Sequence, residues 1–388
     1  MPSSTKGYLA GIFGLSTEGY LLASDLLKNG CKVTMIDETL QLAMSLDRKI
    51  SAQFPSVTSL MDAEVLLPVE PVDIALRNTD FIFFTPKIRK SGDEAKTELD
   101  SKIKDVAKNI SEGSVFVFTL PTYFGGNSRI IDILERISGL TCPKEFSYFY
   151  VPLNPRTKKA IVIGARVKKL DKNKEKFLHV ILGQEKFVGL ATSEAVLSKL
   201  LVSTYSDIVS GIESFRALEN ETEKNEMVSM FKKEDFYLTE IMDNLFDLRI
   251  LMSGYSSGDP MLYLLSGIVR SVDGYVKFLA DQVKNLLKLK ELKASRTRII
   301  IDWPIDEYEM RGEKVLTIAQ LSERLRDFVS EVHVLKSNSR SIGTPRDRTS
   351  GVDKAEIVLR CAPNTTTSET GATSTRFTIN ANLPCSIE

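Results

Sequence analysis

The sequence is poor in the residues that most often carry metal-dependent and covalent chemistry. It has only 2 histidines and 4 cysteines in 388 residues. The cysteines are far apart, without the spacing of a metal site or of a disulfide framework: Cys31, Cys142, Cys361 and Cys385. We therefore expect reduced thiols, a cytoplasmic location and no bound metal. Both histidines fall in segments that are predicted to be a helix or a strand, which argues against a histidine base.

The sequence also lacks a net charge and a long apolar run. Lys+Arg and Asp+Glu both number 51, so there is no overall basic field that would attract nucleic acid. No apolar run reaches the ~18 residues of a membrane-spanning helix, and the first residues lack the hydrophobic stretch of a signal peptide. We expect neither a nucleic-acid partner nor a membrane. The length and the 43% hydrophobic content allow two or three domains with sizeable cores.

The most informative segment covers residues 8–37. An apolar stretch ends at Gly14, an amphipathic helix pattern begins near Thr17, and a second apolar stretch ends at Asp37. This order predicts a strand, a tight glycine turn, a helix and a second strand, which together open a dinucleotide-binding fold. Gly14 permits the sharp turn, and Gly19 lets the helix pack closely on the strand.

The same unit predicts the cofactor. The helix that begins near Thr17 points its free backbone N–H groups and the positive end of its dipole at a pyrophosphate. Asp37, about 20 residues on, can accept hydrogen bonds from the adenosine ribose and would repel a 2′-phosphate, so we expect NAD. Ser16 departs from the pattern, because it replaces the middle glycine and crowds the pyrophosphate. The alternative is a doubly wound sheet that keeps its turn for folding and has lost its ligand.

Strand and helix patterns alternate through the first half of the chain, and the architecture then changes. Further strands are predicted at 80–86, 114–119, 146–152, 159–164 and 186–191, with helices at 96–110 and 129–136. Two long helices follow, over about 194–218 and 261–293. The second carries an apolar stripe from Leu265 to Leu286 that is wide enough to be buried against another helix, in this chain or in a second subunit.

We therefore predict an α/β protein of three parts. An N-terminal Rossmann-type, doubly wound parallel sheet spans residues 1–192, a helical dimerisation domain spans 193–295, and a smaller α/β, nucleotide-binding-like domain spans 296–388. Within the last part, the Ser/Thr-rich stretch 364–375 predicts a mobile loop. A homodimer through Leu265–Leu286 is the default expectation.

This plan resembles that of the UDP-glucose/GDP-mannose (nucleotide-sugar) 6-dehydrogenases. The resemblance is clearest over residues 6–215 and rests on the order of several short segments: Gly14–Gly19, Ile36-Asp37, Phe84-Thr85-Pro86, Gly113–Gly125, Tyr148–Pro152, Ala160–Gly164, and Thr192–Glu194 with Lys199. It implies an NAD-binding domain, a dimer-forming helical domain and a nucleotide-sugar substrate. It also implies that Thr85, Pro86 and Thr122 lie beside the cofactor, together with the residues of the glycine turn.

Much of the chemistry of that family is missing from the sequence. Its members oxidise a sugar C6 alcohol to a carboxylate in two hydride transfers and hold the aldehyde on a cysteine. The corresponding segment here, 252–260, has no cysteine, and none lies between Cys142 and Cys361. The family's catalytic lysine falls at Val209 and its glutamate at Leu153. Electrophile activation, proton transfer and trapping of the intermediate would all be lost together.

Functions of different classes therefore stay open. The first is a pseudoenzyme that binds NAD or a nucleotide, or that acts as a scaffold or regulator. The second is an NAD-dependent oxidoreductase that uses divergent groups such as Thr122, Asn154 and Asp259. A third is a member of the wider 6-phosphogluconate-dehydrogenase-like group with a small acid substrate. The family's nucleotide-contacting arginine matches Arg311 only loosely. By chemistry, the missing groups favour the pseudoenzyme.

Overall fold

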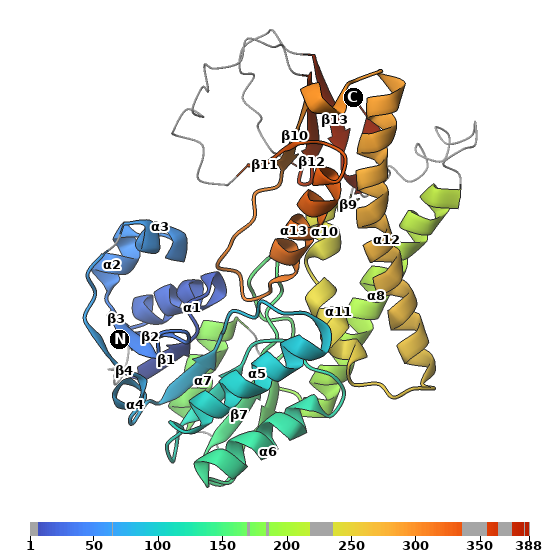
Figure 1. Ribbon diagram of the computed structural model, residues 1–388. Coiled ribbons are helices and arrows are strands. Elements are labelled where there is room, and N and C mark those ends of the chain that lie inside the picture. The colour runs from blue at the N-terminus through green and yellow to red at the C-terminus, as the bar shows by residue number, and fades with distance from the viewer. Residues whose placement is uncertain are drawn as a thin grey trace. The chain divides into compact units, whose positions relative to one another are not determined.

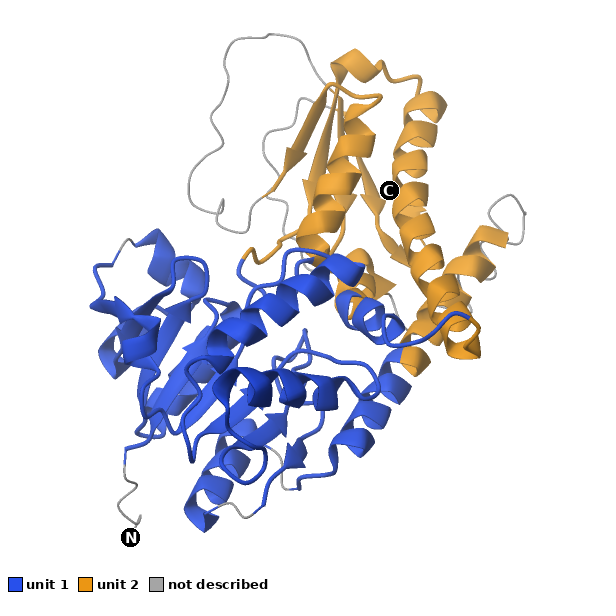
Figure 2. Ribbon diagram, turned by 60° about the horizontal axis from the view of Figure 1, so that its bottom comes forward, with its two compact units in different colours: residues 1–201, 246–257, 308–312 blue, residues 202–245, 258–307, 313–388 orange. Residues whose placement is uncertain are grey.

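The computed structural model describes residues 7–63, 65–168, 171–183, 186–217, 236–335, 355–363, 375–383 and 385–387. The chain forms two compact units that interleave along the sequence (Figure 2). Unit 1 consists of Met1–Leu201, Phe246–Ser257 and Tyr308–Gly312, and unit 2 consists of Val202–Leu245, Gly258–Glu307 and Glu313–Glu388. The division into three consecutive domains stays a prediction. The predicted mobile loop lies outside the described residues except for Thr375.

Unit 1 is built on an eight-stranded sheet in the order β4-β3-β2-β1-β5-β6-β7-β8 (Figure 1). Its central strands run parallel: β1 (Leu9–Phe13), β2 (Lys32–Asp37), β5 (Phe81–Phe84), β6 (Val115–Phe118) and β7 (Ser147–Tyr150). The outer strands are antiparallel to their neighbours: β3 (Leu42–Leu46), β4 (Val69–Pro71) and β8 (Gly164–Arg166). All residues of β5 and β6 are buried, as expected for strands with both faces covered. This confirms the predicted doubly wound, mostly parallel sheet.

Helices cover this sheet. The longer ones are α1 (Thr17–Lys28), α5 (Gly92–Ala107), α6 (Gly126–Ser138) and α7 (Lys172–Leu182). Shorter ones are α2 (Arg48–Gln53), α3 (Val57–Asp62) and α4 (Val72–Ala75), while α11 (Leu245–Met252) enters unit 1 from a later part of the chain. Helices α5 and α6 pack side by side (Figure 1). Each buries apolar residues at helical spacing, such as Leu99, Ile103 and Val106 in α5.

The predicted strands at 159–164 and 186–191 are wrong in the structure. Residues 155–157 form a turn in which the Asn154 side chain accepts hydrogen bonds from the N–H groups of Arg156 and Thr157, both at 2.9 Å. Isolated bridges join Leu153 with Ala160 and Gly164 with Val188, and β8 includes only the last residue of the first predicted segment. In the second predicted segment, a helix already begins at Leu190. A short run of apolar residues was therefore a misleading signal in both segments.

Unit 2 contains a smaller sheet in the order β11-β10-β12-β13-β15. Its strands are β10 (Thr297–Asp302), β11 (Glu331–Val334), β12 (Ala355–Arg360), β13 (Arg376–Asn380) and β15 (Ser386–Ile387). Two short strands, β9 (Phe236–Tyr237) and β14 (Asn382–Leu383), pair with each other. The helical elements are α10 (Leu238–Met242), α12 (Pro260–Leu289), η1 (Ala294–Arg296) and α13 (Glu313–Arg326). The smaller α/β part after the helical middle is thus confirmed.

The sequence left open whether the apolar stripe of α12 is buried within this chain or against a second subunit. Its residues are buried within this one chain, with exposed fractions of 0% at Leu265 and 1% at Leu286. The stripe therefore packs inside the chain, and the expectation that it forms a dimer seam is wrong. The homodimer itself stays a prediction.

One helix in the described part of the chain, α8 (Leu190–Ala217), has the length and mean hydropathy, 1.2, of a possible membrane span. Its pattern is nevertheless one-sided. Leu197, Leu201, Tyr205 and Ile208 are buried, whereas residues between them, such as Leu200, are exposed. This is the pattern of a helix that packs one face against a protein core. The cytoplasmic location stays a prediction.

Candidate functional site

The turn between β1 and α1 has the tight geometry that its glycines predict. Gly14 has a φ of 123°, and a Cβ atom built on it would lie 2.2 Å from the carbonyl oxygen of Thr85. A Cβ atom on Gly19 would lie 2.5 Å from Thr85 Oγ1. Pro86 also lies against this turn, because its Cα atom would be 2.5 Å from the same Cβ of Gly14. Both positions therefore require glycine, and strand, turn and helix touch.

Ser16 is fully buried and caps α1. Its hydroxyl donates to the carbonyl oxygen of Thr85 at 2.7 Å and accepts from the N–H of Gly19 at 3.1 Å. A serine is a preferred residue for this position, since its oxygen satisfies a backbone N–H that the helix leaves free. The residue that departs from the glycine pattern thus serves the helix itself.

The turn also receives a carboxylate from the end of the next strand. Glu38 follows β2, and its side chain is 1% exposed. Its Oε2 accepts from the N–H of Leu15 at 2.9 Å, and its Oε1 accepts from the N–H of Lys87 at 2.9 Å. The ammonium group of Lys102 lies 3.5 Å from Oε1. The backbone N–H of Leu15, at the centre of the glycine turn, is therefore already hydrogen-bonded to an acid of the chain.

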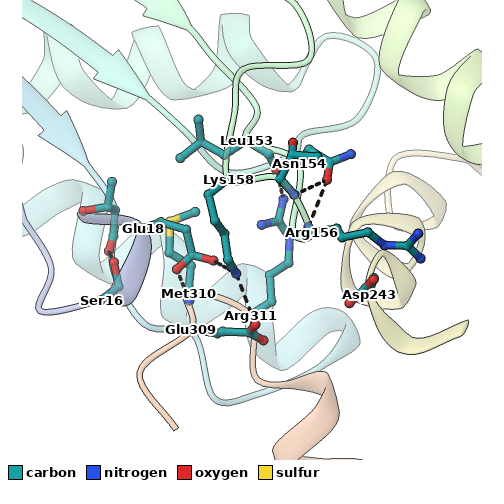
Figure 3. A network of polar contacts seen from close by, with 12 residues as sticks. Ser16, Glu18, Leu153, Asn154, Arg156, Lys158, Asp243, Glu309, Met310 and Arg311 are labelled. Atoms are coloured by element: carbon teal, nitrogen blue, oxygen red, sulfur yellow. Dashed lines mark hydrogen bonds and ion pairs between the residues drawn. The ribbon is translucent and has the colours of Figure 1, made fainter. Parts of the chain in front are cut away.

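A second acid lies in the first turn of α1. Glu18 is 2% exposed, and its carboxylate accepts from Lys158 Nζ at 2.8 Å and from the N–H of Met310 at 2.9 Å (Figure 3). Lys158 also meets Glu309 at 3.1 Å. Burial by itself lowers the pKa of Lys158, but the two carboxylates outweigh it and raise that pKa above its ordinary value. The ammonium group is therefore charged at neutral pH.

Residues 308–312 belong to unit 1 and close over the start of α1; we call them the strap. The N–H of Thr17, the first residue of α1, donates to the carbonyl oxygen of Tyr308 at 2.9 Å. On the other side, the N–H of Ile88 donates to the carbonyl oxygen of Met310 at 2.8 Å. Gly312 is packed so tightly that a Cβ there would lie 2.6 Å from the carbonyl oxygen of Ile88. The strap is thus an integral part of the turn's surroundings.

Arg311 anchors the strap by a buried ion pair. Its Nε lies 2.5 Å from Asp247 Oδ1, and its Nη2 lies 2.9 Å from Asp247 Oδ2 and 2.8 Å from the carbonyl oxygen of Leu153. Burial lowers the pKa of Arg311, but Asp247 more than offsets this effect and raises it. The arginine that was loosely matched to a nucleotide contact is therefore held by this chain's own acid.

The remaining predicted residues are dispersed. Asp37 ends β2, and its Oδ1 accepts from the N–H groups of Thr39 and Leu40 at 2.8 and 3.1 Å. Thr122 is buried, and its N–H donates to the hydroxyl of Tyr150 at 3.1 Å. The Asn154 side chain is used in its own turn, and Asp259 is the N-cap residue of α12 in unit 2. The residues that the structure does bring together are Gly14, Ser16, Thr17, Gly19, Thr85 and Pro86.

The thiols and His179 lie in settings that do not favour chemistry. All four cysteines are buried. Burial raises the pKa of Cys31 and of Cys142 to about 11, and it raises that of Cys361 as well. His179 stacks on Phe187 with ring centres 4.2 Å apart. No group of His, Cys, Asp and Glu among the described residues could hold a metal ion.

At a second glycine turn in unit 1, a buried carboxylate again accepts hydrogen bonds from backbone N–H groups at the start of a helix. Helix α6 begins after Gly125, and the buried carboxylate of Glu194 from α8 lies at its start. Glu194 accepts from the N–H of Gly125 at 2.9 Å, from the N–H of Asn127 at 3.1 Å and from the Asn127 amide at 2.8 Å. Tyr148 holds that amide by donating its hydroxyl to it at 2.7 Å.

Sequence reasoning missed the acids that define these two turns. Glu18, Glu38 and Glu194 were not among the predicted site residues, and neither was Lys158. A signal was available at Glu18, because an acid inside a diphosphate-binding motif is unfavourable for its ligand. Glu38 offered a weaker one, since it directly follows Asp37. Nothing in the pattern indicated that their carboxylates turn inward.

Comparison with solved structures shows the fold. The chain is similar to the UDP-D-ManNAc dehydrogenase of Pyrococcus horikoshii, with 16% identity, a TM-score of 0.63, and 90% of this chain and 88% of that one covered. It is also similar to a UDP-glucose dehydrogenase of Pyrobaculum islandicum, with 13% identity, a TM-score of 0.57, and 92% and 91% covered. No protein-family model and no curated protein sequence matches the chain. The chain thus has the fold of nucleotide-sugar dehydrogenases at low sequence identity.

Proposed function

We infer that this chain is a catalytically silent relative of the nucleotide-sugar dehydrogenases, with a structural or regulatory role in place of sugar oxidation. The observation that carries this proposal is the state of its thiols. The thiolate is the nucleophilic form of cysteine, and a pKa of about 11 at Cys31 and Cys142 leaves almost none of it at neutral pH. Cys361 and Cys385 are also buried. No thiol is therefore available to hold an aldehyde intermediate.

The divergent groups that could have replaced the thiol offer little support for the alternative of an active oxidoreductase. Asn154 uses its side-chain oxygen to stabilise a local turn. A serine or threonine hydroxyl needs an adjacent base to become a nucleophile. Thr122 uses its N–H on Tyr150, and its own Oγ1 would lie only 1.8 Å from a Cβ on Gly126. This hydroxyl lies against Gly126 at the start of α6, and the hydrogen bonds of the described residues include none from it to the nearby carboxylate of Glu194.

A direct assay tests the proposal. The purified full chain is incubated with NAD and, in turn, with UDP-glucose, UDP-N-acetylmannosamine and GDP-mannose, and NADH formation is followed by absorbance. The Pyrococcus horikoshii UDP-D-ManNAc dehydrogenase serves as the positive control. We expect no NADH above the rate without protein. Steady NADH formation that depends on a sugar nucleotide would contradict the proposal, whether or not it survives replacement of all four cysteines.

A further inference from the structure

We propose that the glycine turn Gly14–Gly19 is closed to dinucleotides by the chain's own acids and strap, so that NAD does not bind there. A dinucleotide fold holds its pyrophosphate on the backbone N–H groups at the turn and at the start of the first helix. Two of these groups, at Leu15 and Thr17, already donate to Glu38 and Tyr308 at 2.9 Å each. The N–H of Gly19 donates to Ser16. The proposal concerns the cofactor and does not depend on the loss of catalysis.

The charges at this turn oppose a diphosphate as well. Glu18 in the first turn of α1 and Glu38, which accepts from Leu15, are buried acids, and each is paired with a lysine of this chain, Lys158 and Lys102 respectively. The helix start thus already has the negative charge that its dipole favours. A diphosphate in the same place would meet two carboxylates of its own sign. It would also have to draw the lysines away from partners at 2.8 and 3.5 Å.

The strap makes this closure hard to reverse. To free the N–H of Thr17, the chain must withdraw Tyr308, which continues directly into Met310 and the buried pair of Arg311 with Asp247. Each charge-assisted hydrogen bond that a dinucleotide must break weakens its apparent affinity by about tenfold or more. Several such bonds hold the turn. We therefore expect NAD to be excluded through the millimolar range.

The turn retains its glycines for a reason other than a ligand. Gly14 and Gly19 are required by close contact with Thr85, as the Cβ distances of 2.2 and 2.5 Å indicate. Either glycine would be kept in a protein that had never bound a nucleotide. The glycines of the motif are therefore explained by the close packing of α1 on the sheet. The surrounding acids indicate that the chain's own side chains fill the turn.

Calorimetric titration of NAD and of NADH into the full chain tests the proposal. Wild type and the control Glu94→Gln, whose side chain is 75% exposed on α5, should show no saturable binding. Asp37→Ala and the milder Asp37→Asn remove the acid that would hold the adenosine ribose. If NAD binds and both variants keep its affinity within twofold, the binding site lies outside the glycine turn, which agrees with a closed turn. Stoichiometric binding that either folded variant weakens tenfold or more would overturn the proposal.

The outcomes also separate this proposal from the proposed function. Stoichiometric NAD binding at the turn without NADH formation would refute the closed turn alone. NADH formation from a sugar nucleotide by a chain whose turn binds NAD would refute both. NADH formation by a chain whose NAD binding is unaffected by the Asp37 substitutions would refute only the proposal that the chain is catalytically silent.

Discussion

Helices α1 and α6 both begin at a glycine turn after a parallel strand of unit 1, and in both an acid of the chain fills the helix start. At α6, the donors to Glu194 among the described residues are neutral N–H groups of Gly125 and Asn127. At α1, Glu18 and Glu38 also accept from backbone N–H groups, but each pairs with a lysine. The positive end of a helix explains why both sites hold an acid. The difference lies in how its charge is balanced.

This difference indicates that the two turns have different tasks. The start of α6 is a local cap, in which one side chain satisfies one helix. The start of α1 joins the helix to β2, to Lys158 and to the strap, and so it connects segments from three parts of the sequence. We therefore expect the α6 cap to respond to the loss of hydrogen bonds and the α1 turn to respond also to salt and pH.

The largest effect should come from the anchor of the strap. Arg311→Ala breaks the buried ion pair with Asp247, which typically costs about 3–5 kcal/mol. Urea unfolding followed by circular dichroism measures this loss, and the fluorescence of Trp303 reports unit 2 separately. The matched control is Arg216→Ala, because Arg216 is 42% exposed in its pair with Glu213. A loss of stability as small as that of the control would show that Arg311 does not anchor the strap.

The α6 cap should be next in magnitude. Glu194→Gln turns an amide group towards donors of Gly125 and Asn127, so at least one buried N–H loses its acceptor. We expect a loss of about 2–3 kcal/mol in the free energy of unfolding. The loss should be the same at low and at high salt, since no lysine takes part in this cap among the described contacts. A marked dependence on salt would contradict the comparison of the two turns.

Glu38→Gln should have a smaller effect that does depend on salt. The amide keeps one acceptor for Leu15 or Lys87 but loses its attraction to Lys102, so we expect about 1–2 kcal/mol. Because Lys102 is 18% exposed, added salt screens part of that attraction and the loss should shrink. Unfolding of wild type and variant at two salt concentrations measures this. Equal losses at both concentrations would show that the lysine contributes nothing.

Lys158 should give the smallest effect and a distinctive pH dependence. Its pKa is raised in the folded chain, so its pairs with Glu18 and Glu309 contribute fully below the ordinary lysine pKa, about 10.4, and fade as pH rises through the raised value. Lys158 is 19% exposed, unlike Arg311, and Glu18 keeps its hydrogen bond from Met310, so Lys158→Met should cost about 1 kcal/mol from neutral pH to about pH 10 and less above it. Stability curves of both proteins against pH test this. A difference that grows with pH would have the wrong sign.

The first βαβ unit could be predicted from sequence because its signals are local. The two glycines, the apolar runs and the acid at the strand end all lie within 30 residues of one another, and β2 ends at Asp37, as predicted. The closure of the turn could not be predicted in that way. The N–H that Glu18 accepts from belongs to Met310, 292 residues away in the sequence. Only the folded chain brings the strap to the helix start.

The burial of α12 follows the same rule. Its apolar stripe predicted a buried face correctly, since helical periodicity is a property of the segment alone. Whether that face meets this chain or a second copy depends on the rest of the fold. The buried Leu265 and Leu286 answer this question, and sequence periodicity has no way to do so.

Site-resolved amide hydrogen exchange at Leu15 and Thr17, with and without NAD, tests the closed turn most directly. Both N–H groups donate to acceptors of the chain, the buried carboxylate of Glu38 and the carbonyl oxygen of Tyr308, so they should exchange slowly and at rates that millimolar NAD leaves unchanged. The N–H of Gly125, held by Glu194, is the internal reference. Fast exchange of Leu15 and Thr17 in the free protein that slows at least tenfold when NAD is added would contradict the account.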